Sequence, residues 1–235
     1  MTTAIVLAGG LGTRLRSAVP DLPKPMAPIA GRPFLAYQLD YWLGQGVKRF
    51  VLSVGYLHEA IVDHFGRVYR GAPLDYAVEQ TPLGTGGAVL LALDRLQGSR
   101  DPFLLLNGDT YFEVNLGTLA EFHALRQSEW TFALFRCAQA GRYMGMGVDA
   151  HGRITALKSG SAEPGRLANG GVYLVDPRVL REGAWLPGAK FSLEDDLLPA
   201  AFAAGRRFYG CESTGAFIDI GVPEDYLRAP AMLAA

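Results

Sequence analysis

The 235-residue chain has little of what metal, redox and hydrolytic sites are usually built from. Its two cysteines, Cys137 and Cys211, lie too far apart for a metal knuckle or a Cys-x-x-Cys motif. Its four histidines form no His-Glu-x-x-His pattern, and no Gly-x-Ser-x-Gly elbow is present. The common hydrolase and zinc signatures are therefore excluded, and the cysteines are interpreted as structural thiols in a reducing compartment.

Charge of one sign and long apolar runs are also scarce. The formal net charge is −1, and the four lysines are scattered without a basic cluster, so we expect no nucleic-acid partner. No stretch approaches the ~18 apolar residues of a membrane span. The first residues do not form a signal peptide. We expect a cytoplasmic protein without a membrane partner, folded as a single domain over residues 1–235.

The first twenty-five residues carry the strongest local pattern. An apolar run, Ala4 to Leu7, is typical of a buried strand and leads into Gly9, Gly10, Gly12 and Arg14, with Lys24 later between two prolines. Glycines let several backbone N–H groups approach a ligand, and the cations suit a polyphosphate. The glycines alone fit an ordinary strand-to-helix turn equally well. The spacing matches neither a Walker A loop nor a dinucleotide fingerprint.

Strand and helix patterns alternate through the first half. Strands are expected at residues 50–54, 74–79 and 103–106, with helices at 34–43, 57–65 and after the glycine-rich loop 80–87. This alternation predicts an α/β sandwich with a largely parallel sheet. Ligands of such sheets bind beyond the carboxyl ends of the strands. The loop 9–14, the segment 79–87 and Asp109 all lie at those ends.

The second half contains short strands, a capping pattern from Ser192 to Asp195 and two candidate metal ligands. Asp109 and Asp219 both follow or interrupt apolar strands, where a carboxylate is costly unless it is paired or binds a cation. Together they could hold Mg²⁺, although each could simply cap a turn. Lys158 ends a strand and by default is a surface lysine. Asn169-Gly170-Gly171 either approaches a ligand or forms a bulge.

Taken together, the motifs resemble those of the sugar-1-phosphate nucleotidylyltransferases. The matching segments are Leu7-Ala8-Gly9-Gly10-Leu11-Gly12-Thr13-Arg14-Leu15 with Pro23-Lys24-Pro25, then residues 82–88, 107–109, 169–173 and 217–226, in family order over nearly the whole chain. Residues 22–28 and 31–35 are most similar to the guanylyltransferases that act on D-glycero-α-D-manno-heptose 1-phosphate. One departure is Leu157-Lys158-Ser159, where many relatives have Glu-Lys-Pro.

The resemblance implies a Rossmann-like, three-layer α/β/α core of the glycosyltransferase-A type with a mostly parallel mixed sheet. It implies that residues 1–110 bind the nucleotide and 111–235 the sugar phosphate, with no appended hexapeptide-repeat domain. The implied nucleotide-binding residues are Leu7, Ala8, Gly9, Gly10, Gly12, Thr13, Arg14, Lys24, Glu79, Pro82, Gly84 and Thr85. The implied sugar-phosphate residues are Gly145, Lys158, Asn169, Gly170 and Glu194, and Mg²⁺ falls to Asp109 and Asp219.

The implied reaction is attack of a sugar 1-phosphate on the α-phosphorus of a nucleoside triphosphate, with Arg14, Lys24 and Asp109 as catalytic residues. No general base is needed, because the nucleophile is already an anion; positioning and charge neutralisation supply the catalysis. Glu79 favours guanine, since a carboxylate accepts from both N1–H and N2–H₂ of that base. The expected product is GDP-heptose for a capsule or other surface polysaccharide.

Several alternatives stay open on the sequence. The sugar could be mannose 1-phosphate or another hexose phosphate, and the nucleotide could be UTP, CTP or dTTP. A rival of another class is a non-catalytic subunit that senses nucleotide sugar, although such a sensor would have no need of both metal aspartates. The sequence leaves the oligomeric state open, including a homo-oligomer.

Overall fold

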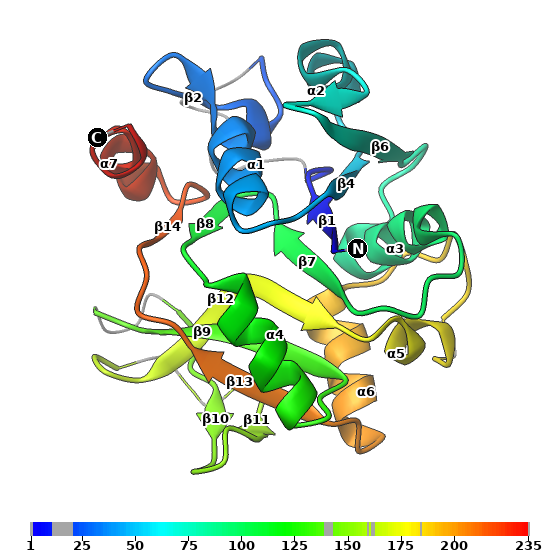
Figure 1. Cartoon of the computed structure of the whole chain (residues 1–235), viewed down its shortest axis with the longest axis vertical. Helices are drawn as coiled ribbons and strands as arrows, with labels where there is room; N and C mark the ends of the chain where they lie inside the picture. The colour runs from blue at the N-terminus through cyan, green and yellow to red at the C-terminus, as the bar shows by residue number, and fades with distance from the viewer. Residues whose placement is uncertain are drawn as a thin grey trace.

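The protein is built on one eight-stranded sheet, seen in a computed structural model that describes residues 2–10, 21–138, 143–158, 160, 163–183 and 185–234. The strands are ordered β13-β9-β12-β7-β1-β4-β6-β5 (Figure 1). Their bounds are β1 Thr3–Leu7, β4 Arg49–Val54, β5 Val68–Tyr69, β6 Ala72–Val78, β7 Phe103–Asn107, β9 Trp130–Arg136, β12 Leu167–Val175 and β13 Phe208–Glu212.

The sheet is mixed, as expected, and its direction changes on one side. β7, β1, β4 and β6 run parallel, with Leu7 paired to Ser53 on one side and to Asn107 on the other. β12 is antiparallel to both β7 and β9, whereas β13 is again parallel to β9. The start of β12 therefore lies at the same sheet edge as the ends of β1 and β7.

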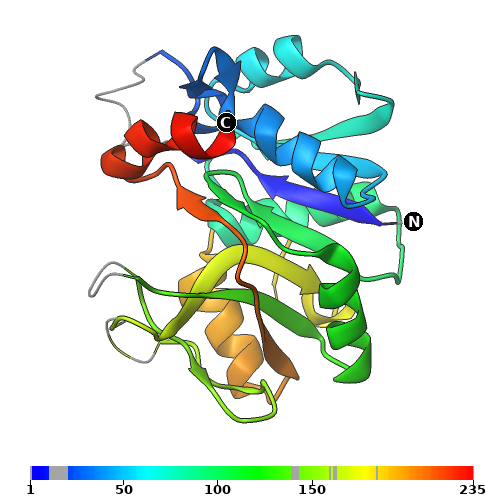
Figure 2. The same ribbon diagram turned by 60° about the vertical axis from the view of Figure 1, so that its left-hand side comes forward.

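Helices cover both faces of the sheet, which gives the three layers predicted (Figures 1 and 2). On one face lie α1 Phe34–Gly44, α2 His58–Phe65 and α4 Leu116–Leu125. The other face carries α3 Gly84–Leu93, α5 Pro177–Arg181 and α6 Leu198–Ala203. Because every central strand is covered twice, its sequence is apolar without alternation.

The strand β7 shows how this double burial works. Leu104 and Leu106 belong to the core cluster under α1 and α4, whereas Phe103 and Leu105 belong to the cluster under α3 and α6. All four are buried, with at most 1% of their surface exposed. Full burial of each such side chain contributes on the order of 1.5–3 kcal/mol, so this strand anchors both halves of the core.

Smaller elements complete the fold. The short sheets pair β2 Pro28–Ile29 with β3 Arg32–Pro33, β8 Thr110–Phe112 with β14 Phe217–Asp219, and β10 Gly147–Val148 with β11 Ile154–Ala156. The remaining elements are the 3-10 turns η1 Lys24–Met26 and η2 Asp94–Leu96, the π-helical turn η3 Leu193–Leu197 and the helix α7 Pro223–Leu233. A third apolar cluster packs α7 against α1 and β2.

Two sequence expectations on this periphery are refined. Ser192 caps η3 through a bond from Asp195 N to its Oγ, but its own N–H is bound by Asp196 Oδ2 and not by Asp195. Cys137 is buried and Cys211 half-buried, and both are free thiols, as interpreted from the sequence. None of the helices in the described residues is long and apolar enough to cross a membrane.

Candidate active site

A cavity of ≈ 550 Å³ opens where β1, β6 and β7 end, at the sheet edge predicted for ligand binding. It collects every predicted nucleotide-site residue that lies in the described part of the chain, namely Leu7, Ala8, Gly9, Gly10, Lys24, Glu79, Pro82, Gly84 and Thr85. Asp109, predicted as a metal ligand, and Glu194, predicted among the sugar residues, line it as well. Gly12, Thr13 and Arg14 lie outside the described residues.

Lys24 and Asp109 form the charged centre of this cavity. Lys24 sits in the turn η1, whose neighbouring prolines fix the backbone φ and so limit where the side chain can reach. Its Nζ donates to Asp109 Oδ2 at 2.5 Å. Only 15% of the lysine side chain is exposed against 37% of the aspartate, so the ammonium lies inside the cavity and the carboxylate faces its opening.

Asp219 approaches the same ammonium from the other half of the chain. The β14–β8 pairing sets Asp219 opposite Thr110, and Ile220 N donates to the Asp109 carbonyl at 3.0 Å. A methyl group added at Gly221 would collide with Lys24 Nζ and lie 2.8 Å from Asp219 Oδ1. Burial, and next the charge of Asp109, raise the pKa of Asp219, against a hydrogen bond from Gly221 N.

This arrangement fits a hard divalent cation. The pKa of Asp219 is raised in part by the charge of Asp109, so the two carboxylates together are short of positive charge, and the Lys24 ammonium beside them pairs with Asp109. Mg²⁺ takes oxygen ligands and usually keeps several waters and substrate phosphates, so two protein carboxylates are sufficient. Within the described residues no group of three or more His, Cys, Asp or Glu forms a fuller metal cage.

Glu79 braces the glycine-rich end of β1. Its Oε2 accepts from Leu83 N at 2.9 Å and so shapes the following loop. A methyl group on Gly9 would collide with Glu79 Oε1 and lie 3.2 Å from Gly55 N, which explains why this position lacks a side chain. Burial raises the pKa of Glu79, with the Leu83 N–H acting against it. The Glu79 side chain also lines the cavity.

Glu194, predicted among the sugar residues, lines the cavity beside the loop 82–87. Thr85 Oγ1 donates to Glu194 Oε2 at 2.7 Å and accepts from Leu193 N at 2.8 Å. Phe191 packs against this loop, because a methyl group added at Gly84 would collide with its backbone and one added at Gly86 with its ring. The loop and η3 are therefore one packed unit, with Glu194 at its inner surface.

The other predicted sugar residues lie beside the cavity and do not line it. Lys158 Nζ forms an exposed ion pair with Asp195 Oδ1 at 2.6 Å. Gly145 pairs with Ala168 as an isolated bridge next to β12. Asn169 donates to the Tyr173 hydroxyl at 2.8 Å and accepts from Gly171 N at 3.0 Å.

The glycines after Asn169 form the bulge that the sequence left as one alternative. The β12–β9 register shifts between Asn169 and Tyr173, and Gly171 has φ +71°. A methyl group at Gly170 would collide with the Phe112 ring, and one at Gly171 would lie 2.6 Å from Thr110 Oγ1. The packing of these two glycines against β8 thus requires small residues whether or not they also touch a ligand.

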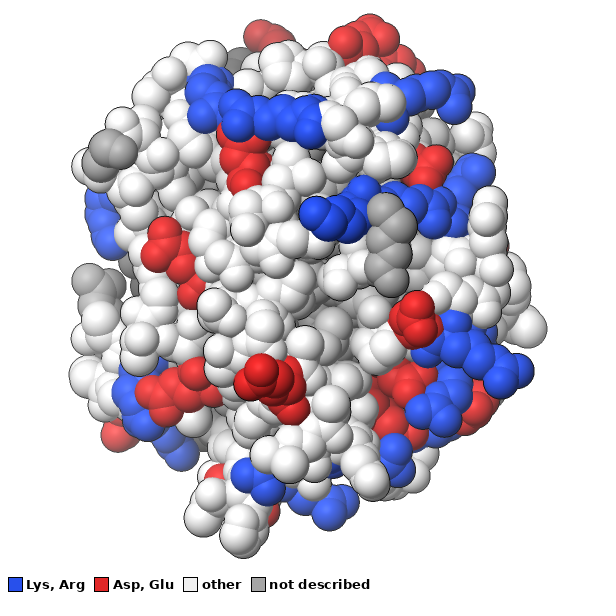
Figure 3. Space-filling view, viewed as in Figure 1, with Lys and Arg blue, Asp and Glu red and all other residues white. Residues whose placement is uncertain are grey.

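Lys190 is a cavity residue that the sequence reading missed. It lines the same space as Lys24 and Asp109. The available signal was its position two residues before the capping Ser192, in a chain with four lysines. On the face shown in Figure 3, basic and acidic side chains are interspersed, in keeping with the net charge of −1.

The chain belongs to the nucleotidyl transferase family, whose sequence pattern matches residues 3–235. It is 41% identical over 226 residues to a D-glycero-α-D-manno-heptose 1-phosphate guanylyltransferase of Aneurinibacillus thermoaerophilus, covering 96% of each chain. Identity to the enzyme of the same name from Campylobacter jejuni is 37%, over 95% of this chain and 96% of that one. The crystal structure of HddC from Yersinia pseudotuberculosis complexed with GMP-PN superposes with a TM-score of 0.81, at 32% identity over 99% of both chains.

Proposed function

We propose that this protein transfers a guanylyl group from GTP to D-glycero-α-D-manno-heptose 1-phosphate, giving GDP-heptose and pyrophosphate. The observation that carries this proposal is the single cavity that gathers the end of β1, Lys24, Glu79 and Asp109, in a chain 41% identical to a guanylyltransferase with this substrate. The GMP-PN complex of the Yersinia pseudotuberculosis protein supports a guanine nucleotide.

In the proposed reaction, a phosphate oxygen of the sugar 1-phosphate forms a bond to the α-phosphorus of GTP. The bond from that phosphorus to the oxygen bridging to the β-phosphate breaks, and pyrophosphate leaves with the electron pair. The nucleophile is already an anion, so this cavity needs no histidine or cysteine to activate it. The groups required are those that hold the reactants in line and offset their negative charge.

The roles fall to residues of both halves. Lys24 and Arg14 hold the triphosphate, and the loop at Gly9 brings backbone N–H groups to it. Asp109 and Asp219 would hold Mg²⁺, which would supply positive charge to offset that of the phosphates. Lys158 would exchange its exposed partner Asp195 for the phosphate of the sugar.

The base and the cellular role complete the proposal. Glu79 accepts from the Watson–Crick edge of guanine, using the oxygen lone pairs left beside the Leu83 N–H bond. The product, made in the cytoplasm, would be a sugar donor for the synthesis of a capsule or other surface polysaccharide. Mannose 1-phosphate is the nearest alternative substrate, because it differs from the heptose only beyond C6.

A substrate matrix tests the function. Four nucleoside triphosphates are combined with heptose 1-phosphate, mannose 1-phosphate and glucose 1-phosphate, with Mg²⁺ or with EDTA, and pyrophosphate release is measured. We expect the highest kcat/KM with GTP and heptose 1-phosphate, and loss of release in EDTA. Release of pyrophosphate with no pair would refute the enzyme and favour a nucleotide-sugar sensor. A higher kcat/KM with mannose 1-phosphate would move the assignment to that sugar.

A further inference from the structure

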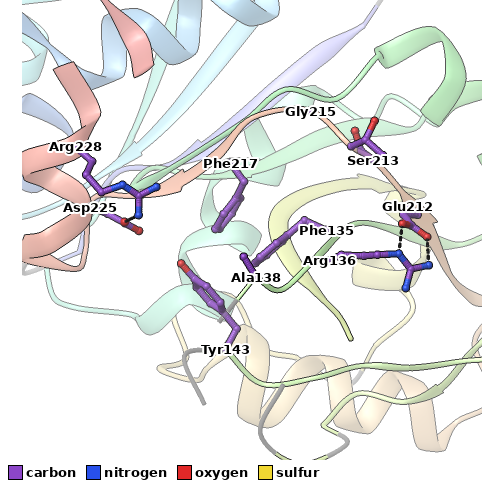
Figure 4. Close-up of a pocket in the computed structure, with 11 residues that line it drawn as sticks. Phe135, Arg136, Ala138, Tyr143, Glu212, Ser213, Gly215, Phe217, Asp225 and Arg228 are labelled. Carbon is purple, nitrogen blue, oxygen red and sulfur yellow. Dashed lines mark hydrogen bonds and ion pairs between the residues drawn. The ribbon is translucent and has the colours of Figure 1, made fainter. Parts of the chain in front are cut away.

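A second cavity of ≈ 480 Å³ lies beyond the far end of the site and has no role in the reaction described so far. We call it the aromatic pocket, after the wall formed by Phe135, Tyr143 and Phe217 (Figure 4). It opens between the ends of β9 and β13, the segment 213–215 and the start of α7. Among the described residues, it shares no lining residue with the nucleotide cavity.

The aromatic wall is a fixed, packed surface. Phe135 and Phe217 stack with their centroids 4.0 Å apart and their planes 15° from parallel. Tyr143 meets both edge-on, at 5.1 and 5.6 Å. Phe112 packs behind Phe217 at 5.6 Å. Such a wall offers C–H and ring surface to the apolar edge of a ligand without needing to rearrange.

Two ion pairs flank this wall on opposite sides (Figure 4). Arg136 donates to both oxygens of Glu212, at 2.6 and 2.7 Å. Arg228 donates to Asp225 Oδ1 at 3.0 Å, and this carboxylate is only 4% exposed. The charges balance within the pocket, so it favours neither an anion nor a cation. Paired carboxylates and guanidiniums still offer acceptors and donors, which together with an aromatic wall suit a neutral chain of hydroxyl groups.

The pocket is linked to the candidate metal ligand Asp219 and to two of the predicted sugar residues through neighbouring positions in the fold. Phe217 and Asp219 project from the same face of β14, about 7 Å apart along the strand. Gly170 packs on Phe112, the ring behind that wall, and Gly145 follows Tyr143 by two residues. A sugar whose phosphate lies near Asp219 can therefore extend its far end toward the aromatic pocket.

We propose that the aromatic pocket binds the end of the sugar farthest from its phosphate, and that it selects sugars with a further hydroxylated carbon beyond C6. This inference rests on the proposed function, and it names the element that separates a heptose from a hexose. The terminal diol of the heptose contacts the aromatic wall through its carbons and the flanking pairs through its hydroxyls. Mannose 1-phosphate lacks the last carbon and leaves these groups to water.

Filling the pocket tests the proposal. Ala138→Trp and Thr214→Trp each place an indole at an exposed lining position, from two different segments. Ala204→Trp is the matched control, because Ala204 is equally exposed at the end of α6 and lines neither cavity. Dissociation constants of heptose 1-phosphate and mannose 1-phosphate are measured by calorimetry, with Mg²⁺ and a GTP analogue that resists transfer. Thermal unfolding of each variant verifies that it is folded.

We expect both pocket variants to weaken heptose 1-phosphate by ~10-fold or more, the scale of losing one fitted carbon and its hydroxyl, with a much smaller effect on mannose 1-phosphate. The affinity of the pocket variants for the GTP analogue should not change. The control variant should bind both sugar phosphates as tightly as the wild type does. Equal weakening of both sugars, or no weakening in either folded variant, would overturn the pocket assignment. Heptose 1-phosphate binding without any turnover would refute the proposed reaction alone and leave the pocket assignment standing.

Discussion

Replacing Lys24 with methionine should have opposite effects on catalysis and on metal binding. The Lys24 ammonium lies 2.5 Å from Asp109 Oδ2. Asp219 lies nearby, since a methyl group added at Gly221 would meet both Lys24 Nζ and Asp219 Oδ1. If Asp109 and Asp219 bind Mg²⁺ as proposed, we expect the lysine of the nucleotide-free protein to compete with the metal for Asp109. In the proposed reaction, the same ammonium would pair with phosphate oxygens once a triphosphate is bound and would assist catalysis.

The size of the competition follows from the geometry. Opposite charges ~4 Å apart interact by roughly 4 kcal/mol at an effective dielectric constant of ~20. Since 37% of the Asp109 side chain is exposed, solvent screening reduces this to about 1–2 kcal/mol. Lys24→Met should then tighten metal binding by the nucleotide-free protein by roughly 5- to 30-fold. Turnover should fall by about 10²-fold or more, because a stabiliser of the departing charge is lost.

Electron paramagnetic resonance of Mn²⁺ provides the binding assay, since Mn²⁺ accepts the same oxygen ligands as Mg²⁺. Pyrophosphate release provides the turnover. Lys190→Met is the matched control, because Lys190 lines the same cavity but pairs with neither aspartate among the described residues. If Mn²⁺ binding to Lys24→Met were unchanged, or no tighter than in the control, the ammonium would not occupy the cation position and the reasoning would fail.

Three further predictions concern the preference for GTP, the contribution of the glycine bulge in β12 to stability, and the loss of stability in acid. Glu79→Gln should lower the preference for GTP over other triphosphates by ~10-fold in competition assays, and an unchanged preference would assign base reading to the backbone. Gly170→Ala should lower the free energy of unfolding by about 1–3 kcal/mol in urea, whereas Gly44→Ala, with open space around it, should be neutral or stabilising. Burial acts to raise the pKa of Asp176, but hydrogen bonds from Arg178 outweigh this effect and lower the pKa. The ionised Asp176 therefore stabilises the folded state fully above the unfolded pKa of ~3.9, and this stabilisation is lost as the pH falls through the lowered pKa of the folded state. Asp176→Asn should therefore be less stable than the wild type by roughly 1–2 kcal/mol at pH 7, with the difference vanishing near pH 2; a pH-independent difference would contradict this.

The sequence was sufficient to predict the sheet and its site edge, because both depend on local patterns. The continuous apolar run of β7 reports burial on two faces, and the polar residues that follow β1, β6 and β7 mark where those strands end. The helix α4 was missed, since Leu116, Leu119 and His123 are its only buried positions and give a weak period. Its start depends on an Asn115 cap, which has no apolar pattern beside it.

Side-chain contacts between residues far apart in the sequence could not be predicted from the sequence. Glu194 lies against the loop 82–87 because Thr85, 109 residues away, donates a hydrogen bond to it. Lys158 meets Asp195 across 37 residues. No spacing rule connects such pairs, since their distance is set by how η3 packs on the loop at Gly86. The same is true of the aromatic pocket, whose walls come from four separate segments.

The direction of β12 distinguishes two edges of the central sheet. One edge lines the candidate site, and the opposite edge carries connections between strands and helices. Because β12 runs against β7, its bulge meets the ends of β1 and β7, and its nine residues carry the chain about 30 Å away to the opposite edge. The exposed residues 98–101 lie at that opposite edge and lead into the start of β7. An engineer who needs to insert a reporter or a second domain should do so there, where added length leaves the strand ends around the cavity in register.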